Sequence, residues 1–167
     1  MDVENLLKSL NARRVRYVII GATAFPVHGF SRITFDIDIF IKATRINASR
    51  TLAALADSGY YVTDLSVDEL LKKKILFRQY ITEADIHPHV AGATFTDVWR
   101  RRVENRIGRT HTYFAGLRDL IEMKKAAGRP KDVEDLRVLE KLQEKQKQKE
   151  KQRKHSNGQR KRKNNPR

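Results

Sequence analysis

The sequence predicts an α+β fold, α/β in the broad sense, in which a small mixed β-sheet is covered by helices and followed by a basic tail. Residues 15–20 and 35–42 are apolar enough to be central strands of that sheet. Apolar residues return at helical spacing elsewhere, as in residues 2–10 and 117–127. The 167 residues contain no internal repeat and are enough to bury one core.

Six short segments are predicted as strands, because they alternate or are rich in β-branched and aromatic residues. They are residues 15–20, 35–42, 60–63, 75–82, 84–89 and 109–114. The turn at residues 22–29 is expected to form a short helix with Pro26 in its first turn, where a missing N–H costs little. The N–H groups at the start of such a helix suit a phosphate group.

Helices are predicted where apolar residues return every three or four positions between a capping residue and a glycine. Two of them are residues 2–10 and residues 117–127, the latter ended by Gly128. A helix capped by Asn47 or Ser49 runs to residue 57, one with a capping box at Ser66 covers residues 67–71, and one capped by Thr96 runs to residue 103. A last helix begins near Pro130 and is expected to bury Val133, Leu136, Leu139 and Leu142.

The positive charge is concentrated at the C-terminal end. Residues 141–167 hold 12 Lys/Arg and 2 Glu, which is +10 of the total net charge of +15. We therefore divide the chain into a domain at residues 1–140 and a tail at 141–167, helical in part and disordered from His155. The tail is either a phosphate-binding polycation or a solubilising extension, and it lacks the aromatic residues that stack on bases.

Several classes of protein are excluded. Without cysteine there are no disulfides and no thiolate metal sites, which favours a reducing, cytoplasmic location. No apolar run is long enough to cross a membrane, and the first ten residues do not form a secretory signal. The sequence therefore predicts a cytoplasmic protein with no membrane partner.

Two acids stand out on the second predicted strand. Asp36 and Asp38 share one face of it, because alternate side chains of a strand point the same way. Their mutual repulsion is relieved when a cation lies between them, and hard oxygen ligands suit Mg²⁺, with Mn²⁺ as the alternative. The pair indicates a metal-dependent phosphoryl-type transfer site. The alternative is an exposed strand end that carries two acids by chance.

The same region resembles a known family. Gly21, His28-Gly29, Arg32-x-Thr34 and Asp36-x-Asp38 are similar to the signature of nucleotidyltransferases of the DNA polymerase β superfamily, and of its AbiEii-like minimal prokaryotic group in particular. A second patch, from Asp119 through Lys124 to Asp135, resembles the C-terminal helices of that group. The resemblance covers residues 16–139. It departs from the family at Ala22, where the family has glycine or serine.

This resemblance implies a nucleotidyltransferase-like fold and a set of site residues. Asp36, Asp38 and Asp85 would bind the divalent ions, and Asp85 would also act as general base. The residues expected to contact the NTP substrate are Gly21, Ala22, Arg32 and Lys124. The acceptor hydroxyl would belong to RNA, such as a tRNA 3′ end, or else to a protein or a small molecule. A toxin–antitoxin system would add a cognate antitoxin as partner.

Other interpretations of the same residues remain open. Asp85, His87 and His89 fall on one strand face and offer a zinc site, although Pro88 disturbs the pairing there. His28 either lies near phosphate or fixes the turn, and we favour the turn. Arg129, Asp132 and Asp135 are expected to form a structural ion-pair cluster. As a whole, the chain is alternatively a non-catalytic module that binds nucleotide, RNA or a partner protein.

Overall fold

The computed structural model describes residues 3–78, 83–130 and 132–163, with only the backbone described for residues 153–163. Within these residues six strands form one mixed sheet in the order β3-β4-β2-β1-β6-β5. The strands are β1 (Tyr17–Ile20), β2 (Asp36–Ile41), β3 (Ile75–Phe77), β4 (Glu83–His87), β5 (Val103–Ile107) and β6 (Thr110–Phe114). The small mixed sheet that the sequence predicts is confirmed.

The centre of the sheet is built from the two most apolar strands. β1 and β2 pair antiparallel, and each has a parallel neighbour on its outer side, β6 and β4 respectively. All four residues of β1 are buried, as central strands require. This topology matters for function, because the parallel pairing of β2 with β4 sets residues 36–40 directly beside residues 83–87.

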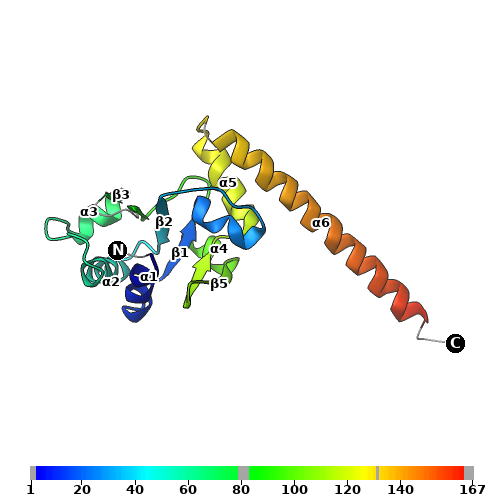
Figure 1. The fold of residues 1–167 in the computed structure, drawn as a ribbon, viewed down its shortest axis with the longest axis horizontal. Helices are drawn as coiled ribbons and strands as arrows, with labels where there is room; N and C mark the ends of the chain where they lie inside the picture. Colours follow the sequence, from blue (N-terminus) through cyan, green and yellow to red (C-terminus); the bar gives the residue numbers. More distant parts are fainter. Residues whose placement is uncertain (1–2, 79–82, 131, 164–167) are drawn as a thin grey trace.

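Helices cover the sheet and one of them leaves it. They are α1 (Val3–Ala12), α2 (Arg45–Asp57), α3 (Val67–Lys72), α4 (Phe95–Arg100), α5 (Leu117–Ala127) and α6 (Asp132–Lys163), with two 3₁₀ turns, η1 (Ala22–Ala24) and η2 (Pro26–His28). Gly128 ends α5 in the left-handed conformation, as predicted. Figure 1 shows α6 packing near α5 at its start and then running away from the sheet.

The capping residues in the sequence predicted the start of some helices correctly and of others wrongly. The Ser66 capping box is present, with Glu69 bonded back to the Ser66 backbone. The cap of α2 is Thr44 rather than Asn47 or Ser49. Asn47 is used elsewhere, because its side-chain amide bonds the backbone of Arg16 and Lys42 and joins α2 to β1.

One strand prediction and one helix prediction need correction. Residues 60–63 form no strand, and Tyr60 instead packs against Phe77. The predicted helix from Thr96 to Val103 is also wrong, because Thr94 caps a shorter α4 and Val103 starts β5. β5 forms a hairpin with β6 around Gly108, whose φ of 57° suits glycine. Of the predicted strand at residues 75–82, positions 79–82 lie outside the described residues.

The C-terminal helix also differs from the prediction. Leu139 is buried as expected, but Val133 is 48% exposed, and the first turn buries Asp132 and Asp135 in its place. Disorder predicted from His155 is wrong as far as Lys163, because α6 continues through these residues. Lys, Arg, Gln and Glu are good helix formers, which suits this composition. α6 spans the predicted domain boundary at residue 140.

A pair of isoleucines tests the position of the core. Ile39 of β2 has no exposed surface, so Ile39→Ala is expected to lower the free energy of unfolding by about 2–5 kcal/mol. Ile46 of α2 is 69% exposed, so Ile46→Ala is expected to change it by less than about 0.5 kcal/mol. Urea denaturation measures both. Equal effects of the two substitutions would contradict the placement of β2 at the centre of the sheet.

Candidate functional site

Two of the three predicted acids, Asp38 and Asp85, come together where β2 and β4 run side by side. Asp36 and Asp38 lie on the same face of β2, and the parallel register puts Asp85 of β4 directly opposite Asp38. Asp36 and Asp38 are partly exposed, whereas Asp85 is only 2% exposed. Asp85 thus lies beside Asp38, in the place that the family resemblance implies for it.

A histidine joins two of these acids. His87 Nε2 lies 2.8 Å from Asp38 Oδ1. Among the described residues, Asp38, Asp85 and His87 each offer a ligand atom, and these atoms all lie within 4.8 Å of one another. Asp36 is outside this group, and its carboxylate accepts a hydrogen bond from the Thr34 hydroxyl. Two carboxylates and an imidazole suit a divalent ion such as Mn²⁺, and carboxylate oxygens also suit Mg²⁺.

The alternative zinc set is not assembled as the sequence suggested. His87 faces Asp38 and Asp85, but His89 lies beyond the end of β4, and its Nε2 is 3.0 Å from the carbonyl oxygen of Leu71. Of these two histidines, His87 is therefore the one that joins the acids. The pairing of β2 with β4 determines which histidine lies beside the acids, and the spacing of residues along β4 does not.

Two cations that the sequence analysis missed hold Asp85. Lys74 Nζ contacts Asp85 Oδ2, and Arg78 Nη1 lies 2.6 Å from Asp85 Oδ1. Burial by itself would raise the pKa of the Asp85 carboxyl, but the hydrogen bonds from Arg78 and Lys74 outweigh it and keep that pKa below its ordinary value. Lys74 and Arg78 flank β3 on the side of Leu76, which pairs with Asp85. Alternation along the chain puts both cations on the same face as Leu76, but only the pairing of β3 with β4 brings that face to Asp85.

Gly21 makes room for Asp38. It has a φ of 66°, and a Cβ atom at this position would lie 2.2 Å from Asp38 Oδ2. Glycine is therefore needed both for the backbone conformation and for the close approach of the carboxylate. The next residue, Ala22, begins η1 and is nearly buried. Two 3₁₀ turns replace the single short helix predicted for residues 22–29.

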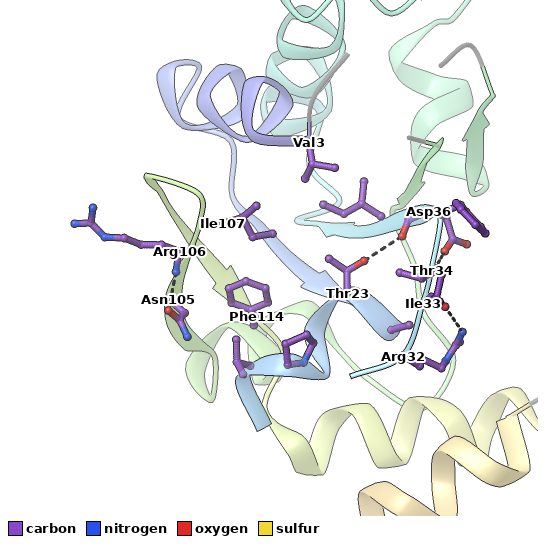
Figure 2. Close-up of a pocket in the computed structure, with 15 residues that line it drawn as sticks. Val3, Thr23, Arg32, Ile33, Thr34, Asp36, Asn105, Arg106, Ile107 and Phe114 are labelled. Carbon is purple, nitrogen blue, oxygen red and sulfur yellow. Dashed lines mark hydrogen bonds between the residues drawn. The ribbon is translucent and has the colours of Figure 1, made fainter. Parts of the chain in front are cut away.

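Two cavities meet at these residues. A cavity of about 460 Å³ is lined by the acids and by Lys74, Arg78, Lys124 and Arg129. A second cavity of about 600 Å³ has mainly apolar walls, and in Figure 2 Ile107 and Phe114 lie across it from Ile33 and Thr34. Ala22, Arg32 and Asp36 line both. A ligand that bridges the two cavities would pass Asp36.

Lys124 lies in an ion cluster at the edge of the first cavity. Its ammonium lies 2.6 Å from Asp132 Oδ1 and 2.8 Å from Asp135 Oδ2, and the side chain is 8% exposed. Arg129 pairs with Asp132, and Arg32 Nε lies 3.0 Å from Asp135. The cluster joins α5, α6 and the loop before β2, as expected for Arg129, Asp132 and Asp135. The predicted contact of Lys124 with the nucleotide stays a prediction. In this structure its ammonium pairs with two carboxylates instead.

His28 fixes the turn that leads into the site. Its Nε2 lies 2.8 Å from the carbonyl oxygen of Ala115, which follows β6. Burial lowers the pKa of His28, and the hydrogen bond with the Ala115 backbone opposes this shift. This contact is the one that we favoured from the sequence, and it connects the loop before β2 to the other side of the sheet.

Matched glycine variants test the close approach at Gly21. Gly21→Ala is expected to displace the Asp38 carboxylate and to weaken Mn²⁺ binding roughly tenfold or more, which electron paramagnetic resonance measures. Gly29 also has positive φ, but a Cβ there meets nothing within 4 Å. Gly29→Ala therefore carries the backbone strain alone and should keep the Mn²⁺ affinity. Equal losses in the two variants would show that strain is responsible.

Comparison with known proteins gives the family of the chain. No curated protein matches the sequence. In the part of the chain that the structure describes, no helix is long and apolar enough to span a membrane. One family model matches residues 1–146, and its description is a nucleotidyltransferase of unknown function (DUF6036). The chain therefore belongs to this nucleotidyltransferase family.

Proposed function

We propose that this protein is a metal-dependent nucleotidyltransferase that moves a nucleoside monophosphate from an NTP to a hydroxyl group and releases pyrophosphate. One observation carries the proposal. Asp36 and Asp38 share a face of β2, and Asp85 lies opposite Asp38 in an open cavity. Membership of a nucleotidyltransferase family supports the same activity.

The side chains suggest a division of roles. Asp38 and Asp85 would hold a divalent ion, Mg²⁺ or Mn²⁺, with His87 as a further ligand or as the group that orients Asp38. When bound, such an ion neutralises negative charge on the phosphates. Asp36 lies on the wall between the two cavities, where the α-phosphate and the acceptor would meet.

The transfer step needs a base for the acceptor hydroxyl. The acceptor oxygen attacks the α-phosphorus, the bond from that phosphorus to the pyrophosphate oxygen breaks, and the hydroxyl proton passes to a carboxylate. The family resemblance assigns this proton to Asp85. A carboxylate with a lowered pKa and two cationic partners is a weak base. Asp85 can therefore accept the proton only after Lys74 and Arg78 have left it.

The direction of approach follows from the charges around the two cavities. An in-line displacement puts the attacking oxygen opposite the leaving pyrophosphate. The first cavity, which has Lys74, Arg78 and Arg129 beside the acids, suits pyrophosphate. The acceptor then enters from the apolar cavity, past Asp36.

We favour RNA as the acceptor. The exposed lysines of α6 between positions 145 and 151 form a polycation that can neutralise phosphates without reading sequence. A terminal base and ribose would pack against the apolar walls of the second cavity, which include Phe35 and Pro26. The AbiEii-like subgroup, a toxin–antitoxin role with a cognate antitoxin, and a cytoplasmic location rest on the sequence alone and are part of this proposal.

The rival function is a non-catalytic module that binds nucleotide, RNA or a partner protein. Ala22 lines both cavities, and the family resemblance implies that a contact made there by glycine or serine to phosphate would be lost. The ion pairs of Asp85 with Lys74 and Arg78 also suit a protein that binds its ligand without turnover. Binding of NTP by wild-type protein with no labelled product from any acceptor would support this rival.

An exchange of one acid tests catalysis. With labelled NTPs, Mg²⁺ and total RNA, the wild-type protein is expected to form labelled product, and Asp36→Asn to lower the rate on the order of 10²-fold or more. Asp68→Asn is the control, because Asp68 is an exposed acid of α3 that pairs with Arg45. Equal rates in wild type and Asp36→Asn would contradict the proposed site.

A change of charge on α6 tests the RNA acceptor. Replacing Lys145, Lys147, Lys149 and Lys151 with Gln is expected to lower labelling of RNA and to flatten its salt dependence, since each phosphate contact contributes roughly 0.7 to the slope of log affinity against log salt concentration. Glu144→Gln with Glu150→Gln is the matched control on the same stretch. Transfer to protein or to small hydroxyl compounds should not change. A product that is insensitive to all these lysines would point to one of those acceptors.

A further inference from the structure

Lys74 and Arg78, the two cations that bond Asp85, have more freedom to move than the carboxylate itself. The Asp85 side chain is 3% exposed and fixed in β4, whereas the side chains of Lys74 and Arg78 are 39% and 40% exposed. Both cations reach Asp85 from β3, a three-residue strand at the edge of the sheet. Their long, flexible side chains can therefore turn toward the cavity while Asp85 stays in place.

The two cations compete with a metal ion for the same oxygens. Asp85 belongs to the group with Asp38 and His87 that can hold a divalent ion, and Lys74 and Arg78 occupy both of its oxygen atoms. A divalent ion in contact with Asp85 would lie within a few Å of two positive charges, and like charges at that range repel. Metal binding thus requires that at least one cation leave Asp85.

A phosphate chain offers the displaced cations a new partner. Lys74 and Arg78 line the same cavity as Asp36, Asp38 and Asp85. A guanidinium binds phosphate oxygens through paired hydrogen bonds, and an ammonium binds them as a compact charge. Lys124, which the family resemblance suggests for this task, is 8% exposed and held by two buried aspartates, whereas the second partner of Arg78, Glu83, has a side chain that is 38% exposed. The mobile cations of the cavity are therefore the better candidates.

We infer that Lys74 and Arg78 bind the phosphates of the incoming nucleotide, and that in the ligand-free chain they hold Asp85 in place of the metal ion. The inference rests on the proposed function, because it assigns the triphosphate to this cavity. When a metal–nucleotide complex binds, Lys74 and Arg78 would leave Asp85 for phosphate oxygens, and Asp85 would then be free to hold the ion. No covalent bond changes in this step.

If this exchange occurs, removing one cation changes the affinity for metal and the affinity for phosphate in opposite directions. A purely structural ion pair would not have this effect. Removing one cation takes away a competitor of the metal, so binding of metal alone becomes tighter. The same removal takes away a phosphate contact, so binding of a phosphate chain becomes weaker. Cations that only support the fold would leave both affinities unchanged or weaken both.

Variants of the two cations test the inference in the full chain. For Lys74→Met and Arg78→Met, the affinity for Mn²⁺ alone, measured by electron paramagnetic resonance, is expected to rise several-fold. The affinity for inorganic tripolyphosphate with Mg²⁺, measured by calorimetry, is expected to fall roughly tenfold. Each single variant leaves the other cation on Asp85, and circular dichroism checks the fold. Lys74→Gln and Arg78→Gln repeat the test with polar side chains of intermediate length.

Lys73 provides the matched control. It is exposed at the end of α3, next to Lys74 in sequence, so Lys73→Met should change neither affinity. Unchanged or weaker Mn²⁺ binding in the Lys74 and Arg78 variants, or unchanged tripolyphosphate binding, would overturn the inference. Neither measurement needs turnover. An exchange seen in a protein without transfer activity would therefore refute the proposed function and leave the role of the two cations standing.

Discussion

The parallel pairing of β2 with β4 is the constraint on which the site depends, because it sets two carboxylates against each other at the middle of the sheet. Asp38 and Asp85 are direct partners in this register, and Asp85 is buried. An uncompensated buried charge is costly, so the surrounding residues have to supply positive or polar partners. His87 meets Asp38, two cations meet Asp85, and Gly21 leaves the space that Asp38 fills.

The sequence predicted well what neighbouring residues determine. The apolar runs of β1 and β2, the Ser66 capping box and the Gly128 stop are signals within a few residues, and the structure confirms each of them. Alternation along β2 likewise placed Asp36 and Asp38 on one face. Errors arose at the ends of elements. Thr94 caps α4 where Thr96 was expected, and the expected helix ran on to Val103, which is the first residue of β5.

The rest of the site depends on contacts between distant residues, which spacing along the chain cannot reveal. His87 meets Asp38 only because β2 and β4 are parallel and in this register, and a shift by one residue would turn the histidine to the other face. Lys74 and Arg78 reach Asp85 only because β3 pairs antiparallel with β4. The partners of Lys124 come from α6, whose first turn was expected to bury Val133 and instead buries Asp132 and Asp135.

Two ion clusters lie on the walls of one cavity. The exposure of their side chains indicates which cluster supports the fold and which can exchange its partners for a ligand. Around Lys124 both partners are buried acids, and Arg129 and Arg32 close the cluster from outside. Separating these groups would leave charges buried without a partner, so this cluster is suited to joining α5 to α6. Around Asp85 only the acid is buried, and its cations can regain water or phosphate as they leave. The cations of this second cluster can leave at low cost when an ion takes their place on Asp85, so it is the cluster in which a ligand can replace a protein group.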